Sequence, residues 1–115
     1  MKVLYLAFTL LLMTARNCSK KAATAIVPVC IQQKIDAIRQ QPKGNPAAEV
    51  YEYRYNGATV YYFSGSCCDQ YNTVYDSSCR YVCAPSGGIT GKGDRKCADF
   101  DSVAKRVRLV WKDER

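Results

Sequence analysis

Hydrophobic residues follow three different spacings along the chain. They form an eleven-residue apolar run over Val3–Met13, then a helical stripe that starts at Val27, and then a two-residue alternation through most of the remainder. A period near 3.6 residues indicates a helix with one buried face, and a period of two indicates half-buried strands. The pattern therefore predicts an N-terminal apolar segment, one helix and a set of β-strands.

The helix is predicted to begin at Pro28, because proline suits the first helical turn. Pro42 and Gly44 end it and open a loop that reaches Pro46. Cys30 borders its apolar face, which consists of Val27, Ile31, Ile35 and Ile38.

A β-hairpin is the clearest local prediction. Asn56-Gly57 separates Val50–Tyr55 from Ala58–Phe63, and Asn-Gly between strand-forming runs is typical of a two-residue type I′ turn. Such a turn pairs Tyr55 with Ala58, Tyr53 with Val60 and Tyr51 with Tyr62 on one side. We expect this more apolar side to face the helix. The other side carries Val50, Glu52, Arg54, Thr59, Tyr61 and Phe63.

Further strands complete the predicted sheet. Asn72–Tyr75 and Cys79–Ala84 form a second hairpin, a helical turn falls within Asp99–Arg106, and Val107, Leu109 and Trp111 alternate along a last strand. The fold class is α+β: a helix packed on a small antiparallel sheet of about five strands.

The N-terminal run fits a secretory signal peptide, with Lys2 as its basic residue; it is too short for a transmembrane helix. It leads to Cys18, as in a bacterial lipoprotein. We expect residues 1–17 to be the signal, 18–26 a tether that begins at acylated Cys18, and 27–115 a single domain. Cleavage after Ala25, at the small residues Ala23 and Ala25, is the alternative, and it would give a secreted soluble protein.

Either cleavage leaves six cysteines outside the cytoplasm, where an even number indicates disulfides. We expect three, with Cys30 bonded into the adjacent pair Cys67 and Cys68. Cys79 and Cys83, four residues apart on one strand, lie about 13 Å apart at ~3.3 Å per residue, too far to bond. All six are Cys30, Cys67, Cys68, Cys79, Cys83 and Cys97.

Charge and composition exclude several function classes. Removing the signal with Lys2 and Arg16 lowers the net charge from +7 to +5, so part of the basicity belongs to the signal. In this compartment we expect contact with membrane rather than with nucleic acid. The chain has no histidine, which removes Ser-His-Asp catalysis and the usual catalytic zinc ligands, and we expect no metal or cofactor.

Three sequence features suggest more specific chemistry. Paired carboxylates suit a hydrolase, although turn roles are the commoner use of aspartate in loops. The glycine-rich segment Ser86–Gly93 resembles a phosphate loop weakly, and Asp94 beside it suits calcium weakly. The dense tyrosines suit an aromatic binding face, for which Tyr61 and Phe63 are the candidates. The candidate carboxylates are Asp69, Asp76, Asp94, Asp99 and Asp101.

Two segments, Cys67–Asn72 (CCDQYN) and Cys83–Asp94 (CAPSGGITGKGD), carry a family resemblance. With them, the chain from Cys30 to Arg115 resembles small bacterial envelope lipoproteins that carry a domain of unknown function. The resemblance implies a localisation and no activity. Val74–Ala84 is similar, more weakly, to Kazal-type protease inhibitors, which implies Arg80 or Lys92 as the residue presented to a protease.

Together these patterns favour a non-enzymatic, lipid-anchored domain that binds a protein, peptide or glycan in the bacterial envelope, at the outer membrane or in the periplasm. A protease inhibitor with a disulfide-braced loop is one alternative. A carboxylate-dependent hydrolase is another.

The lipoprotein prediction has a direct test in the intact mass of the protein isolated from its native membranes. We expect a chain that starts at Cys18, carries acyl groups and has no free thiol among the other six cysteines. A mature chain that starts at Ile26 would contradict the anchor, and six free thiols would contradict the disulfide framework.

Overall fold

The computed structural model describes residues 26–65, 67 and 69–115, so the predicted signal and Cys18 lie outside the described residues. In chain order the elements are α1 (Val29–Arg39), β1 (Glu49–Tyr55), β2 (Ala58–Phe63), β3 (Tyr71–Asp76), β4 (Tyr81–Gly87), α2 (Phe100–Val103) and β5 (Lys105–Lys112). The predicted α+β class and five-stranded antiparallel sheet are confirmed. In this part of the chain, no helix has the length and apolar character needed to cross a membrane.

The sheet has the strand order β4-β3-β2-β1-β5, with antiparallel pairing throughout. The Asn-Gly hairpin has the predicted register, with Tyr55 opposite Ala58 and Tyr51 opposite Tyr62. Asn56 and Gly57 both have positive φ, which the type I′ turn requires. The last strand, β5, returns to pair with β1 and thereby places the C-terminal segment beside the first hairpin.

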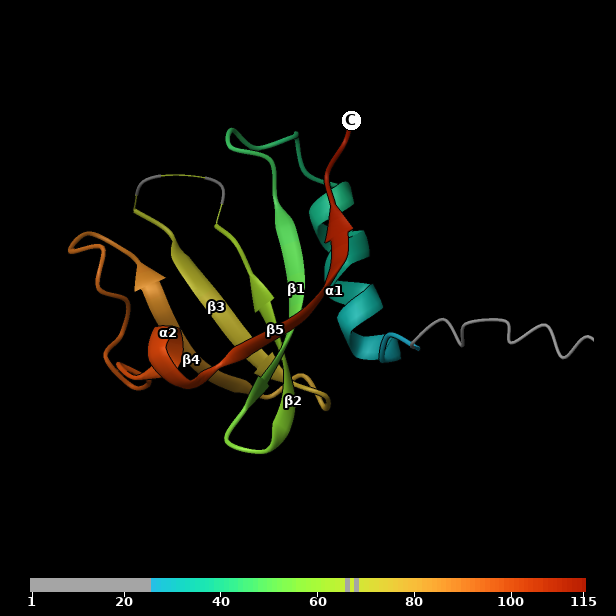
Figure 1. The fold of residues 1–115 in the computed structure, drawn as a ribbon. Helices are drawn as coiled ribbons and strands as arrows, with labels where there is room; N and C mark the ends of the chain where they lie inside the picture. Colours follow the sequence, from blue (N-terminus) through green and yellow to red (C-terminus); the bar gives the residue numbers. More distant parts are fainter. Residues whose placement is uncertain (1–25, 66, 68) are drawn as a thin grey trace, which may run out of the picture.

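Both faces of the sheet are covered in part, and Figure 1 shows α1 and α2 at opposite sides of it. On one face Ile31 and Ile35 of α1 pack against three sheet residues, Val50, Tyr61 and Phe63. On the other face Phe100 of α2 forms a second cluster with Val60, Val74, Cys83 and Cys97.

The prediction that the tyrosine-rich side of the first hairpin faces α1 is therefore wrong. Helix α1 packs on the side of Val50 and Phe63, and the tyrosine-rich side packs around Phe100, whose ring centroid lies 5.1 Å from that of Tyr53. Alternation places residues on two sides of a strand but does not say which element covers each side. Because both sides of this hairpin carry large apolar groups, both are able to form a core.

Two disulfides between described cysteines connect these layers. Cys30–Cys79 joins the first turn of α1 to the β3–β4 turn, and Cys83–Cys97 joins β4 to the segment before α2. The expected bond from Cys30 to the Cys67-Cys68 pair is thus wrong, because α1 runs so that its first turn lies beside the β3–β4 hairpin. Each bridge between distant segments is expected to contribute about 2–4 kcal/mol to the free energy of unfolding.

The glycine-rich segment folds into a tight loop against β4. The Gly93 amide donates to the Gly87 carbonyl, and the Asp94 amide donates to Ala84. A Cβ on Gly93 would lie 1.8 Å from the Ala84 carbonyl oxygen, whereas one on Gly91 would meet nothing within 4 Å. Both glycines have positive φ, so the two positions differ in what an added side chain would contact and not in backbone conformation.

This difference predicts the outcome of two alanine substitutions. Gly91→Ala should lower the free energy of unfolding by about 1 kcal/mol, the usual cost of positive φ for a residue with a side chain. Gly93→Ala should cost about 1–3 kcal/mol more, because its methyl group also meets the backbone of β4. Urea unfolding of the two variants measures both values, and equal losses would show that the loop is not held as described.

Candidate functional site

Helix α1 leaves part of its own side of the sheet uncovered. Strand pairing places Tyr75 beside Tyr61 and Thr73 beside Phe63, so these β3 residues point to the same face as the core beneath α1. Tyr81 of β4 pairs with Tyr75 and continues the row. The side chains of β3 and β4 therefore extend the sheet surface beyond the edge of the helix.

A groove of about 680 Å³ lies between α1 and this surface. The second half of α1 and the loop after it form one wall, and residues of β2 and β3 with Ser64, Gly65 and Gln70 form the rest of the lining. The residues that line it are Lys34, Ala37, Ile38, Gln41, Pro42, Gly44, Ala48, Phe63, Ser64, Gly65, Gln70, Tyr71, Thr73 and Tyr75.

A row of two aromatic rings starts in the groove at Tyr75 and continues outside its lining at Tyr81, and an ammonium group lies over each ring. The Lys34 Nζ atom lies 4.0 Å from the centroid of the Tyr75 ring, and the Lys96 Nζ atom lies 5.5 Å from that of Tyr81. The Tyr75 and Tyr81 rings meet edge to face at 6.0 Å. Lysine above a tyrosine ring is a favourable cation–π arrangement, so both ammonium groups are held over the row.

Tyr81 is held by a neighbouring carboxylate. Its hydroxyl donates to the Asp94 carboxylate at 2.5 Å. Partial burial and this hydrogen bond raise the pKa of Tyr81 to about 12, since ionising the phenol would place two negative charges together. Burial opposes ionisation of Asp94, but the hydrogen bonds from Tyr81 and the Lys96 amide outweigh it and lower the pKa of Asp94. Tyr81 therefore acts as a neutral hydrogen-bond donor.

Tyr71, at the other end of β3, packs one part of its ring against the protein and exposes much of the rest to solvent. It is 49% exposed, yet a Cβ on Gly88 would lie only 2.5 Å from its Cε1 atom. The ring thus packs against the backbone of the glycine-rich loop, which restricts its orientation. An exposed aromatic ring with a restricted orientation is a good platform for a flat apolar surface.

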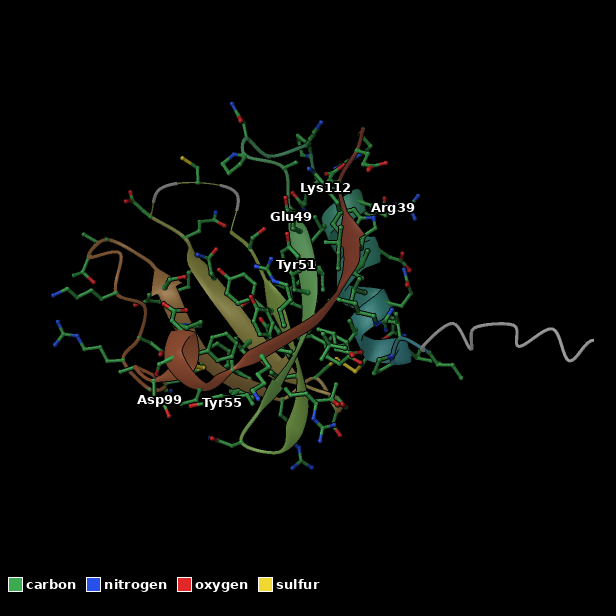
Figure 2. All side chains as sticks on the ribbon, viewed as in Figure 1. Arg39, Glu49, Tyr51, Tyr55, Asp99 and Lys112 are labelled. Carbon is green, nitrogen blue, oxygen red and sulfur yellow. A yellow bond between two sulfur atoms is a disulfide. The ribbon has the colours of Figure 1, made fainter. Side chains whose placement is uncertain are left out.

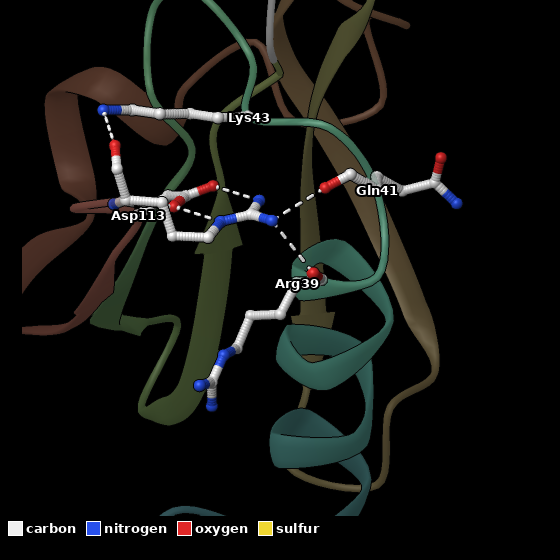
Figure 3. Close-up of polar contacts among 5 residues, drawn as sticks. Arg39, Gln41, Lys43 and Asp113 are labelled. Atoms are coloured by element: carbon white, nitrogen blue, oxygen red, sulfur yellow. Dashed lines mark hydrogen bonds and ion pairs between the residues drawn. The ribbon is translucent and has the colours of Figure 1, made fainter.

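The helical wall is fixed at its C-terminal end by Arg115 (Figure 3). Its guanidinium donates to the carbonyls of Arg39 and Gln41, at 3.0 and 2.9 Å, and to both oxygens of Asp113. Lys43 Nζ donates to the Arg115 carbonyl. Carbonyls at a helix end lack intrahelical partners, and a cation suits them. We call Arg39, Gln41, Lys43, Asp113 and Arg115 the C-terminal clasp.

Among the acidic and basic residues that the structure describes, Asp113 alone is buried, with 2% of its surface exposed. The hydrogen bonds from Arg115 outweigh the effect of burial and lower the pKa of Asp113 to about 2. The charge on this carboxylate therefore stabilises the folded state at neutral pH.

Tyr61 and Phe63, the residues predicted to form an aromatic binding face, were expected on the side of the sheet away from the helix but lie on the side that α1 covers. The two residues are 2% and 7% exposed and lie in the core under α1, because that side of the hairpin faces the helix. Phe63 still reaches the groove lining. The exposed tyrosine rings are instead those of Tyr71 and Tyr81 on the second hairpin.

The opposite face of the sheet has its own aromatic groups. Arg106 lies 4.1 Å above the Tyr51 ring, and the Tyr51 hydroxyl donates to Glu49. In Figure 2 the side chains of Tyr55 and Asp99 lie together below α2, and the Tyr55 hydroxyl donates a hydrogen bond to the Asp99 carboxylate at 2.7 Å. The rings on this face pack against one another: Tyr51 contacts Tyr53, and both Tyr53 and Tyr55 contact Phe100.

Two of the five candidate carboxylates, Asp76 and Asp94, accept hydrogen bonds within their own turns. Asp76 accepts hydrogen bonds from the amides of Ser78 and Arg80, and Asp94 accepts from the Lys96 amide. Within residues 26–65, 67 and 69–115 no group of acidic residues and cysteines is arranged to hold a metal ion. Asp94 therefore belongs to no metal-holding group among these residues.

The residues predicted for protease inhibition and phosphate binding also lie in tight turns. The Arg80 amide donates to Asp76, and the Arg80 carbonyl accepts from the Asp76 amide, so its backbone is used within the hairpin. In the glycine-rich loop, the backbone amides of four glycines already donate hydrogen bonds to carbonyls of this chain: Gly87, Gly88, Gly91 and Gly93. A phosphate loop needs such amides free and a helix after it, whereas the next helix, α2, begins only at Phe100.

Residues 36–113 match the family described as a domain of unknown function, DUF6970, and the chain belongs to this family. No curated protein and no solved structure matches the chain. The matched range includes the whole sheet and most of the groove lining, so the groove is built from the family's domain.

The C-terminal clasp predicts how stability depends on pH. Because the pKa of Asp113 is lowered from about 3.8 to about 2 on folding, its stabilising contribution is complete above pH ~4 and is lost as the pH falls toward 2. Asp113→Asn should be less stable than wild type at pH 6, and the difference should shrink between pH 4 and 2.

Urea unfolding at a series of pH values measures this difference. Glu114→Gln, a change at the exposed neighbouring residue, is the control and should keep the wild-type profile. A constant difference between wild type and Asp113→Asn across this range would contradict the stated role of the carboxylate.

Proposed function

We propose that this chain is a non-enzymatic, extracytoplasmic domain, attached to the bacterial envelope through Cys18, that binds a peptide or a glycan in the groove beside α1. The groove carries the proposal, because it combines exposed tyrosine rings with a few polar groups. Binding sites for small or extended ligands are commonly concave, mostly apolar and provided with a small number of fixed polar groups.

The compartment is supported by the cysteines and the N-terminal pattern together. Cys30–Cys79 and Cys83–Cys97 are disulfides between distant segments, and such bonds persist in oxidising compartments. The apolar run that leads to Cys18 supports a secretory route and an acylated anchor.

A binding role suits the chemistry of the groove better than catalysis. Its lining has hydroxyl, amide and aromatic side chains and one lysine, and among these residues there is no carboxylate, cysteine or histidine to act as nucleophile or general base. Tyr81, the neighbouring group with the strongly raised pKa, is a phenol that stays protonated at neutral pH. Neutral hydrogen-bond donors and rings orient a ligand without transforming it.

The groove can be tested by filling it. Ala37 lines the groove on an exposed part of α1, and Gln33 is exposed on the same helix outside the lining. In a screen of immobilised oligosaccharides and peptides, Ala37→Trp should weaken the binding of every ligand of the wild type at least about tenfold, because an indole would occupy the cavity.

Gln33→Trp is the matched control, with the same added side chain, and should bind within about twofold of wild type. Equal binding by wild type and Ala37→Trp would refute the groove as the site. Turnover of a bound ligand, followed by mass spectrometry of the ligand after incubation, would refute the non-enzymatic part of the proposal.

A further inference from the structure

The electrostatics of the groove restrict its ligand. Lys34 is the only charged side chain among the described residues that line it. Lys34 is half-buried and forms no ion pair with any carboxylate in the part of the chain that the structure describes. A half-buried ammonium group without a counter-ion attracts an anion, and interactions with it are strengthened by the nearby low-dielectric wall.

The second ammonium of the aromatic row differs from the first. Lys96 lies over Tyr81, but Asp94 is close enough for its charge to interact with Lys96, and the Lys96 amide bonds to the same carboxylate. Lys96 is thus partly neutralised by this chain, and it lies outside the groove lining. The unbalanced charge of the row is that of Lys34.

The remaining lining groups favour sugar rings over peptide backbone. Tyr71 offers an exposed ring of restricted orientation, which suits the flat apolar face of a pyranose. Side-chain amides and hydroxyls line the same groove, from Gln41, Gln70, Ser64 and Thr73, and such groups both donate to and accept from sugar hydroxyls. A bound peptide strand would instead need a row of free backbone groups, and β3 already pairs on both sides with β2 and β4.

From these contacts we infer that the groove binds an oligosaccharide that carries a carboxylate, with a sugar ring on Tyr71 and the carboxylate at Lys34. This inference rests on the proposed binding role of the groove. Tyr71 and Tyr75, which lies under Lys34, are four residues apart on one strand, about 13 Å at ~3.3 Å per residue. The span exceeds a single sugar ring, so the ligand is an oligosaccharide rather than a monosaccharide.

Two carboxylated oligosaccharides, trigalacturonic acid and a hyaluronan tetrasaccharide, test the inference by calorimetric titration of the full mature chain. Each is compared with its methyl ester, which keeps the sugar rings and removes the charge, and with triglutamate, which keeps carboxylates without sugar. At least one acid should bind about tenfold more tightly than its ester and than triglutamate, because a hydrogen-bonded charge at a partly buried site has about this worth.

Matched variants assign the two contacts. Lys34→Gln should remove the preference for acid over ester, whereas Lys96→Gln should retain it, although both lysines lie over tyrosine rings. Tyr71→Ala should weaken the acid and its ester alike, by about threefold to tenfold. Circular dichroism of each variant verifies its fold.

The outcomes separate this inference from the proposed function. Equal affinity for acid and ester, a preference for triglutamate, or no binding of either acid overturns the carboxylated oligosaccharide. If Ala37→Trp nevertheless abolishes the binding of other ligands from the immobilised set, the groove remains a binding site with a different ligand. Loss of the acid preference in Lys96→Gln but not in Lys34→Gln would also overturn the assignment.

Discussion

The structure depends on the need to cover both faces of a five-stranded sheet with fewer than a hundred residues. One eleven-residue helix is the main cover for one face, and a four-residue helix with its disulfide-linked approach covers part of the other. A helix of this length spans about 16 Å at ~1.5 Å per residue, whereas five strands spaced about 4.8 Å apart extend over about 19 Å. The open area beside α1 follows from this shortage of covering structure, and it is where the groove lies.

Because α1 is short, its position depends on fastenings at its two ends. The Cys30–Cys79 bond fixes its first turn to the β3–β4 hairpin, and the Arg115 guanidinium binds the carbonyls at its last turn. Packing of Ile31 and Ile35 between these points holds its middle on the sheet. A disulfide at the first turn, apolar packing in the middle and charged hydrogen bonds at the last turn thus fix the position of one helix on the sheet. That position sets the width of the groove.

The elements and the first hairpin's register could be predicted from the sequence, because helical spacing, Asn-Gly and alternation are local signals. The face that α1 covers could not, since Val50 and Tyr53 lie on opposite sides of β1 and both have apolar partners. The pairing of Cys30 with Cys79 depends on the direction of α1 across the sheet, which no local pattern encodes. For the same reason, the density of tyrosines does not distinguish covered rings from exposed ones, and only tertiary packing shows that Tyr61 is covered and Tyr71 exposed.

The pairing of β5 with β1 contains two register shifts, between Val50 and Tyr51 and between Glu52 and Tyr53. Such irregularities bend a strand and interrupt the even row of amides and carbonyls along its outer side. Lysines at both ends of β5, Lys105 and Lys112, add repulsion between like strands. Where two copies of the chain meet, a β5 edge of this kind resists strand-to-strand pairing between them.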